Sequence, residues 1–273
     1  MASASAPLDL PALAAAAWAL VAGPERPPAT PDRPATDPTP APIEPAAPAP
    51  TEPVASPPTD PQPARTPVAR RPARRVVGIA GAPGAGKSTL ARALVAAVEE
   101  RYGAGTAAYL PLDGFHLSNA QLARLGLTDR KGSAPSFDVW GYAALLERVV
   151  RQEEYEIYVP DYDRTLHEPV AARHLVPPTA RLVITEGNYL ACDAPGWREA
   201  RRSLAALWYL ETADDVREQR LVERQLAGGK DGARARAWVA GNDRPNGELI
   251  KESRWRCDRI LVPFGMDMLN WRD

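Results

Sequence analysis

Nine consecutive residues of this chain have the types and the spacing of a phosphate-binding loop. They are Gly81, Ala82, Pro83, Gly84, Ala85, Gly86, Lys87, Ser88 and Thr89, which match the pattern Gly, four residues of any type, Gly-Lys-Ser/Thr. Glycines let such a loop turn its backbone N–H groups inward around a polyphosphate. The Lys87 ammonium would reach the β- and γ-phosphates, and the Ser88 hydroxyl would be a ligand of Mg²⁺. The loop therefore predicts binding of a nucleotide such as ATP together with Mg²⁺.

Two acidic side chains directly follow apolar segments and are candidates for the remaining chemistry. Asp113 follows residues 106–112, and Glu186 follows residues 180–185. Ligands of open α/β sheets bind at the carboxyl ends of the strands, so both side chains would lie beside the phosphate loop. Asp113 is then a candidate general base for a substrate hydroxyl, and Glu186 is a candidate ligand of Mg²⁺ or of its water. The alternatives are a plain Asp-Gly turn and a helix-capping or turn glutamate.

The segments that must position these residues alternate between strand and helix patterns. Strands are predicted at 75–80, 106–112, 156–159, 180–185, 204–210 and 258–262, and helices at 90–101, 142–151 and 214–226. Such alternation predicts an α/β fold in which helices cover both faces of a parallel sheet.

A basic segment broken by glycines predicts a helical lid at about 217–241. Arg217, Arg220 and Arg224 recur at three- and four-residue spacing, and a glycine-rich break at 228–232 follows them. A helix, a glycine hinge and a second basic helix are typical of a lid that closes over phosphates. Arg220 and Arg224 are the predicted nucleotide contacts of this lid, and a solvated helix face is the alternative.

The N-terminal quarter of the chain has a different composition. Residues 23–73 are rich in Pro and Ala with few larger apolar side chains, and we expect a disordered linker there. Within residues 1–22, apolar side chains at helical spacing predict a short helix that could dock a partner. This segment lacks the basic start of a signal peptide and is too short to span a bilayer. The folded domain is therefore predicted at 74–273.

Net charge and cysteine content limit which partners and which cell compartment we expect. The net charge of −1 argues against a general nucleic-acid surface. Cys192 and Cys257 give no framework of disulfides or metal ligands, which favours the reducing cytoplasm. The three histidines lack metal-site spacing, and His174 has no partner motif. We expect a small-molecule substrate with a hydroxyl group and no nucleic-acid or membrane partner; a homodimer stays open.

Taken together, residues 75–263 resemble the P-loop kinase superfamily that contains uridine kinase, phosphoribulokinase and bacterial pantothenate kinase. The resemblance is carried by the loop, Asp113-Gly114-Phe115, Lys131-Gly132, Phe137-Asp138, Tyr162-Asp163 with His167, and Glu186-Gly187. In particular, the chain looks like a bacterial group described as nucleoside/nucleotide kinase-like or fructose-transport-associated kinase. This implies a P-loop NTPase fold and ATP-dependent phosphorylation of a hydroxyl on a nucleoside, sugar or pantothenate-like alcohol.

The resemblance also implies an acceptor pocket. Its residues would be Phe115, His116, Lys131, Asp138, Tyr162, Asp163, Arg164 and His167. The lid departs from uridine kinase, because Gly228-Gly229-Lys230-Asp231 replaces an arginine-bearing sequence. Two other classes stay open: a GTP-dependent switch, for which Asp193 to Gly196 fits Asp-x-x-Gly without a guanine-reading motif, and a transport or regulatory ATPase.

Overall fold

The computed structural model describes residues 6–7, 9–21 and 73–263. Apart from residue 73, the predicted disordered linker at 23–73 lies outside these residues. The described residues belong to one compact unit.

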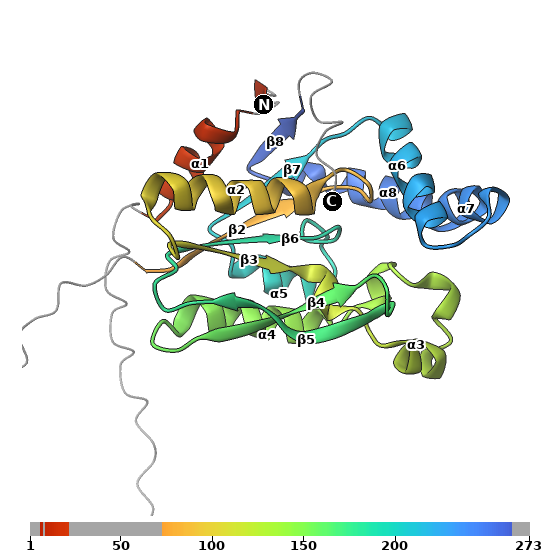
Figure 1. Ribbon diagram of the computed structural model, residues 1–273, viewed down its shortest axis with the longest axis horizontal. Helices are drawn as coiled ribbons and strands as arrows, with labels where there is room; N and C mark the ends of the chain where they lie inside the picture. Colours follow the sequence, from red (N-terminus) through yellow and green to blue (C-terminus); the bar gives the residue numbers. More distant parts are fainter. Residues whose placement is uncertain (1–5, 8, 22–72, 264–273) are drawn as a thin grey trace, which may run out of the picture. The chain divides into compact units, whose positions relative to one another are not determined.

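A parallel sheet of six strands forms the centre of the described structure (Figure 1). The strand order is β1-β8-β7-β2-β6-β3, and every pair is parallel. The strands are β1 (Ala6–Pro7), β2 (Arg75–Ala80), β3 (Ala107–Pro111), β6 (Leu182–Glu186), β7 (Ala206–Leu210) and β8 (Arg259–Val262). The predicted α/β fold is thus confirmed, since five of these strands fall on segments whose apolar runs predicted them.

Helices cover both faces of this sheet. They are α1 (Leu10–Ala19), α2 (Lys87–Tyr102), α3 (Asn119–Leu125), α4 (Val139–Arg151), α5 (Trp197–Arg202), α6 (Asp214–Ala227), α7 (Gly232–Trp238) and α8 (Arg244–Glu252). Successive strand residues face opposite sides: Val77 and Ile79 pack with the α1 and α2 side chains, whereas Val76 and Ala80 pack with those of α4 and α5. The apolar strands are buried on both faces for this reason.

A separate antiparallel hairpin lies beside the sheet and differs from the prediction. Strands β4 (Ile157–Asp163) and β5 (Glu168–Val176) pair with each other, with a register shift between Val159 and Asp161. The sequence predicted only a short strand at 156–159. Most β5 side chains are exposed or half-buried, so this strand has no apolar run to indicate it.

The N-terminal helix is part of the folded unit, whereas the sequence placed the domain start at residue 74. Helix α1 packs along α2, where the Trp18 ring stacks on Tyr102 at 4.5 Å between centroids. Strand β1 extends the sheet by pairing with β8.

Arg74 anchors the beginning of β2. Its guanidinium is buried and donates to the backbone oxygens of Ala180, Val149, Gln152 and Pro177. Two of these oxygens belong to the C-terminal end of α4, which therefore lies at the amino end of the sheet. The carboxyl ends of the strands lie at the opposite edge.

Candidate active site

The loop between β2 and α2 has two positions, Gly84 and Gly86, whose backbone conformation requires glycine. Gly84 has φ +78°, and a Cβ there would lie 2.7 Å from the carbonyl oxygen of Arg217 in α6. Gly86 has φ +93° and is the N-cap of α2. The loop thus presents the N-terminal end of a sixteen-residue helix, which favours an anion such as a phosphate group.

Lys87 is buried at the first position of α2. Its Nζ donates to the backbone oxygen of Ala82 at 3.1 Å and to Oδ1 of Asn188 at 2.6 Å. Burial lowers the pKa of Lys87 to about 8, and the carboxylates of Glu186 and Asp113 act in the opposite direction. Asn188 was not assigned from the sequence; its position directly after Glu186-Gly187 was the available signal.

Ser88 and Glu186 are joined across the site. Ser88 Oγ donates to Glu186 Oε1 at 2.8 Å, and the hydroxyl of Tyr109 donates to the same oxygen at 2.8 Å. Burial raises the pKa of Glu186, and the charge of Asp113 raises it further. A hydroxyl and a carboxylate are ligands that suit Mg²⁺, so these residues fit the predicted metal. Tyr109 was missed because its partner is more than seventy positions away.

Strand register brings Asp113 to this site. Pro111 pairs with Glu186, and Asp113 follows two residues later in a 3₁₀ turn at Leu112–Phe115. The Asp113 side chain is half-buried and accepts no hydrogen bond from any described residue. Gly114 is required beside it, because a Cβ there would lie 2.3 Å from the backbone oxygen of Pro160 in β4. The turn therefore packs tightly on the hairpin.

A small pocket connects these groups. It is lined by Ser88, Arg92, Tyr109, Pro111, Asp113, Asp161, Tyr162, Arg164 and Glu186. The sequence assigned Ser88, Asp113, Tyr162, Arg164 and Glu186 to the site, and the structure brings these five together. Arg92 and Asp161 were missed: Arg92 lies one helical turn beyond Ser88, a spacing that could have indicated it.

The sequence matches no protein-family model. Individual proteins with similar sequences are found, however. The chain is 35% identical over 189 residues to the uncharacterized protein YggC of Escherichia coli, covering 69% of this chain and 77% of that protein. It is 33% identical over 160 residues to a Schizosaccharomyces pombe protein named "Putative uridine kinase C227.14", covering 57% and 68%. A solved structure from Silicibacter sp. TM1040, described as a "putative fructose transport system kinase", superposes with a TM-score of 0.64 at 38% identity, covering 70% of this chain and 91% of that chain.

The chain belongs to the P-loop kinase superfamily of uridine kinase and bacterial pantothenate kinase. The resemblance inferred from its motifs is thereby confirmed.

Aromatic rings pack behind Tyr162, which lines one wall of the kinase pocket. The ring of His116 lies 4.8 Å from that of Tyr162 and 4.1 Å from that of Phe137 between centroids. Burial lowers the pKa of His116, and the His116 Nδ1 lies 2.8 Å from the backbone oxygen of Asp113. Phe115 instead packs against Tyr142 and the core, with ring centroids 5.2 Å apart, so it supports the wall from behind.

Lys131 and His167 join the loop after Asp113 to the hairpin turn. The Lys131 Nζ donates to Oδ1 of Asn119 at 2.6 Å and to the backbone oxygen of His167 at 2.5 Å. The Lys131 ammonium also lies 5.1 Å from the centroid of the Tyr162 ring. His167 has φ +54° and takes part through its backbone, while its side chain is exposed.

Two predicted acceptor residues have local structural partners. Asp138 is the N-cap of α4 and accepts from the backbone N–H of Gly141 at 2.9 Å. Asp163 accepts from the backbone N–H groups of Thr165 and Leu166 at 2.9 Å and pairs with Arg173. These bonds occupy both carboxylates in turns and caps, and neither side chain lines the pocket.

The lid of the kinase contacts the loop through α6. Arg220 donates to the backbone oxygen of Gly84 at 3.3 Å, and the charge of Arg224 contributes to the lowered pKa of Lys87. Arg217 is 1% exposed and donates to the backbone oxygen of Pro83 at 2.9 Å. The sequence noted Arg217 on the basic helix face without predicting this anchor.

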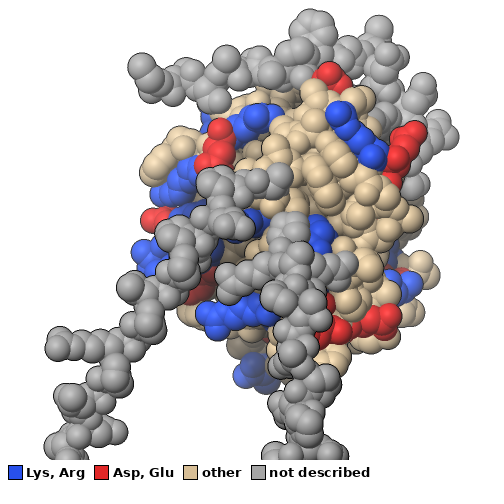
Figure 2. All heavy atoms as spheres, turned by 90° about the vertical axis from the view of Figure 1, so that its left-hand side faces the viewer, with Lys and Arg blue, Asp and Glu red and all other residues tan. Residues whose placement is uncertain are grey.

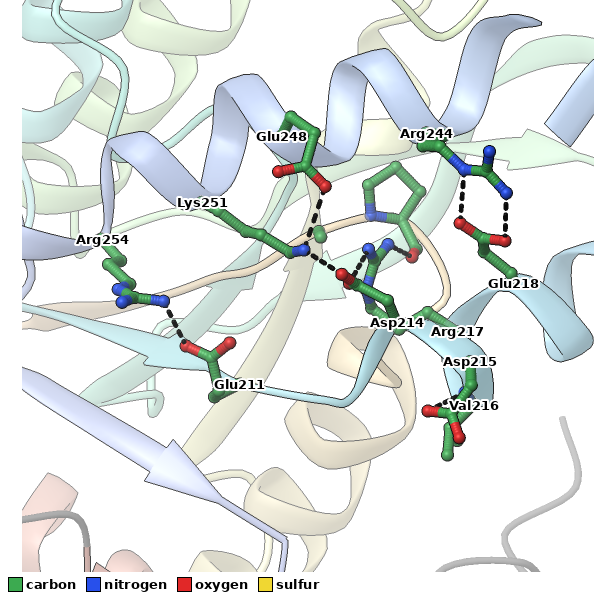
Figure 3. Close-up of polar contacts among 12 residues, drawn as sticks. Glu211, Asp214, Asp215, Val216, Arg217, Glu218, Arg244, Glu248, Lys251 and Arg254 are labelled. Carbon is green, nitrogen blue, oxygen red and sulfur yellow. Dashed lines mark hydrogen bonds and ion pairs between the residues drawn. The ribbon is translucent and has the colours of Figure 1, made fainter. Parts of the chain in front are cut away.

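Ion pairs tie α6 to α8 at the base of the lid (Figure 3). Asp214 accepts from both Arg217 and Lys251, and Arg244 donates two bonds of 2.7 Å to Glu218. A π-helical turn at Val239–Asp243 connects α7 to α8. Within it, Asn242 Nδ2 donates to the backbone oxygen of Lys131 at 3.2 Å, which links the lid to the loop opposite.

Proposed function

We propose that this protein is an ATP-dependent kinase that transfers the γ-phosphoryl group to a hydroxyl of a small metabolite. One observation carries the proposal: Asp113 has no hydrogen-bond donor among the described side chains and lines the same pocket as Ser88 and Glu186. A carboxylate there is free to accept a proton next to the phosphate loop.

In the proposed reaction, the acceptor oxygen bonds to the γ-phosphorus while the bond from that phosphorus to the β–γ bridging oxygen breaks. The hydroxyl proton passes to Asp113, and ADP is the leaving group. Lys87, with Arg220 and Arg224 on the lid, offsets negative charge on the phosphates. Mg²⁺ held by Ser88 and Glu186 would neutralise further phosphate charge. In this proposal Tyr162, which lines the pocket and packs against His116, positions the acceptor.

The names of the relatives indicate a broad group of acceptors. Relatives carry the names uridine kinase and pantothenate kinase, and a related structure is described as a fructose transport system kinase. A nucleoside, a sugar and a pantothenate-like alcohol therefore form the first panel of acceptors. The lid bond from Asn242 to the Lys131 loop suggests that acceptor and nucleotide are enclosed together during transfer.

We place this reaction in the cytoplasm, which supplies ATP and keeps Cys192 and Cys257 as the free thiols that the structure has. Every helix in the described ranges falls short of the length and apolarity needed to cross a membrane. Acidic and basic side chains are interspersed on the face that Figure 2 displays. A homodimer is compatible with the proposal.

The test is ADP release by the full chain with ATP and Mg²⁺ across this panel, with the Asp113→Asn variant measured in parallel. An acceptor that stimulates the wild type should lose about 10²- to 10⁴-fold in kcat in the variant, because the general base is gone. ATP affinity should be unchanged in Asp113→Asn. A variant that keeps more than about a tenth of the activity contradicts the base assignment. ADP release that no acceptor stimulates contradicts the kinase proposal.

A further inference from the structure

Two cationic side chains lie near Tyr162, one in the lining of the pocket and one beside the Tyr162 ring. Arg164 lines the pocket together with Tyr162. Lys131, from a different segment, places its ammonium 5.1 Å from the centroid of the Tyr162 ring. Both side chains are separate from Lys87 and from the lid arginines that face the nucleotide.

Neither cation forms an ion pair with an acidic side chain in the described part of the chain. Both hydrogen bonds of the Lys131 ammonium go to uncharged oxygens, on Asn119 and on the His167 backbone. The Arg164 guanidinium has no hydrogen bond or ion pair to any residue that the structure describes. Glu168 is the acidic group that acts on Lys131, but its carboxylate accepts from the backbone N–H of Asn119 at 3.0 and 3.1 Å.

The positive charge of both groups acts on His116, whose ring packs against Tyr162 of the pocket. The pKa of His116 is lowered mainly by burial, and Lys131 and Arg164 each lower it further. The His116 ring lies 4.8 Å from that of Tyr162 between centroids, so a field that acts on the imidazole also acts on a ligand beside the Tyr162 ring.

The side of the pocket next to the phosphate loop carries acidic side chains. Asp113 and Glu186 lie there, and the charge of Asp113 contributes to the raised pKa of Glu186. The third carboxylate, Asp161, is already bonded to His174 at 2.9 Å and to the backbone N–H of Tyr162 at 2.7 Å. The pocket therefore holds two carboxylates next to the phosphate loop, with Arg92 of α2 also in its lining, while the hairpin supplies Arg164.

We propose that the acceptor carries an anionic group, a phosphate or a carboxylate, that binds between Arg164 and Lys131 beside Tyr162 while its hydroxyl lies at Asp113. This rests on the proposed function and narrows its substrate class. A neutral alcohol would leave both cations without an ionic partner, whereas an anion gains charge-assisted hydrogen bonds from both. Arg164, a planar donor, suits either anion.

The first test measures anion binding without turnover. Inorganic phosphate is titrated by calorimetry into the full chain saturated with a non-hydrolysable ATP analogue and Mg²⁺, so that the phosphate loop is already filled. We expect saturable binding in the wild type and at least about tenfold weaker binding in Arg164→Met and in Lys131→Met. Arg164→Met removes an exposed side chain and should fold normally.

Arg148→Met is the matched control. Arg148 is an exposed cation in the last turn of α4, and it bonds to Gln152. Arg74 binds this end of α4 at the amino end of the sheet. Its loss removes the same charge without approaching the pocket, so phosphate affinity should stay within about twofold of the wild type. Absence of phosphate binding in the wild type, or equal binding in Arg164→Met, overturns the proposal.

The second test compares acceptors in matched pairs: pantothenate with pantothenol, uridine monophosphate with uridine, and fructose 1-phosphate with fructose. We expect the anionic member of a pair to have a kcat/KM at least about tenfold higher, and Arg164→Met to abolish that preference. The pairs also separate a carboxylate from a phosphate. Faster turnover of the neutral members overturns the charge assignment while supporting the kinase. If no acceptor is used but phosphate binds as expected, the kinase proposal fails and the anion site stands.

Discussion

Ser88 Oγ and Glu186 Oε1 are joined by a 2.8 Å hydrogen bond that links the first turn of α2 to the last residue of β6. We propose both oxygens as ligands of Mg²⁺, and this hydrogen bond fixes their relative position. Tyr109 donates to the same carboxylate oxygen, which fixes its orientation. Two strands and one helix therefore hold the proposed metal ligands in place.

Glu186→Gln should weaken the dependence of the reaction on Mg²⁺ in a measurable way. The amide keeps the shape but loses the charge, so the Mg²⁺ concentration for half-maximal ADP release should rise by about 10- to 100-fold. Glu147→Gln, an exposed residue of α4 that pairs with Arg151, is the control and should behave as the wild type. A Glu186→Gln protein with an unchanged Mg²⁺ requirement contradicts the metal assignment.

ATP binding should weaken above about pH 8. The pKa of Lys87 is lowered from its ordinary 10.5 to about 8 by burial, and nucleotide binding needs the charged ammonium. Affinity for a non-hydrolysable analogue should fall by about tenfold per pH unit above this pKa. Calorimetric titrations at several pH values from 7 to 10 measure this, and a constant affinity across them would refute it.

The lowered pKa of Lys87 also makes the stability of the fold depend on pH. Between about pH 8 and 10.5 the unfolded chain keeps the Lys87 proton and the fold does not, so the unfolded state binds more protons. The contribution of Lys87 to the free energy of unfolding therefore rises with pH across this window. Lys87→Met should remove this contribution in pH-dependent denaturant titrations; an identical pH slope in the variant would count against it.

Arg217→Met should loosen the phosphate loop from the lid. The change removes the buried donor to the backbone oxygen of Pro83. It also removes one of the two cationic side chains that donate to Asp214. We expect the free energy of unfolding to fall by about 1–3 kcal/mol and ATP affinity to fall with it.

Arg244→Met is the matched comparison for Arg217→Met. It removes the exposed pair with Glu218, which joins α8 to α6 (Figure 3), and exposed ion pairs contribute only about 0–1 kcal/mol. Urea denaturation and calorimetry compare the two variants. Equal effects would mean that the buried bond to Pro83 has no special role.

Trp18→Ala should destabilise the kinase core through α1. The Trp18 ring stacks on Tyr102 of α2 with a 9° angle between the ring planes, and α1 buries Leu13 and Ala17 on the same surface. We expect the free energy of unfolding to fall by about 1–2 kcal/mol, combining lost ring stacking and lost burial. Trp140→Ala, whose residue is 58% exposed, should change stability by less than about 0.5 kcal/mol. Equal unfolding midpoints for Trp18→Ala and the wild type would show that α1 does not stabilise the core.

The sequence alone determined the parts of the site that local chain order controls. The loop at 81–89 has its strand before it and its helix after it, and Asp113 and Glu186 each follow an apolar strand. Parallel strands end at one edge of a sheet, so these three groups had to meet once the fold class was recognised. The family followed from the same motifs.

Only the tertiary structure decided which polar side chains are free for a ligand. Asp138 and Asp163 carry the same carboxylate as Asp113, yet a helix cap and a hairpin turn occupy them. Asn188 and Tyr109 became site residues through contacts with Lys87 and Glu186, at sequence separations of 101 and 77. A hydrogen bond depends on distance and direction in space, which strand register and packing set, and residue type and spacing along the chain do not specify them.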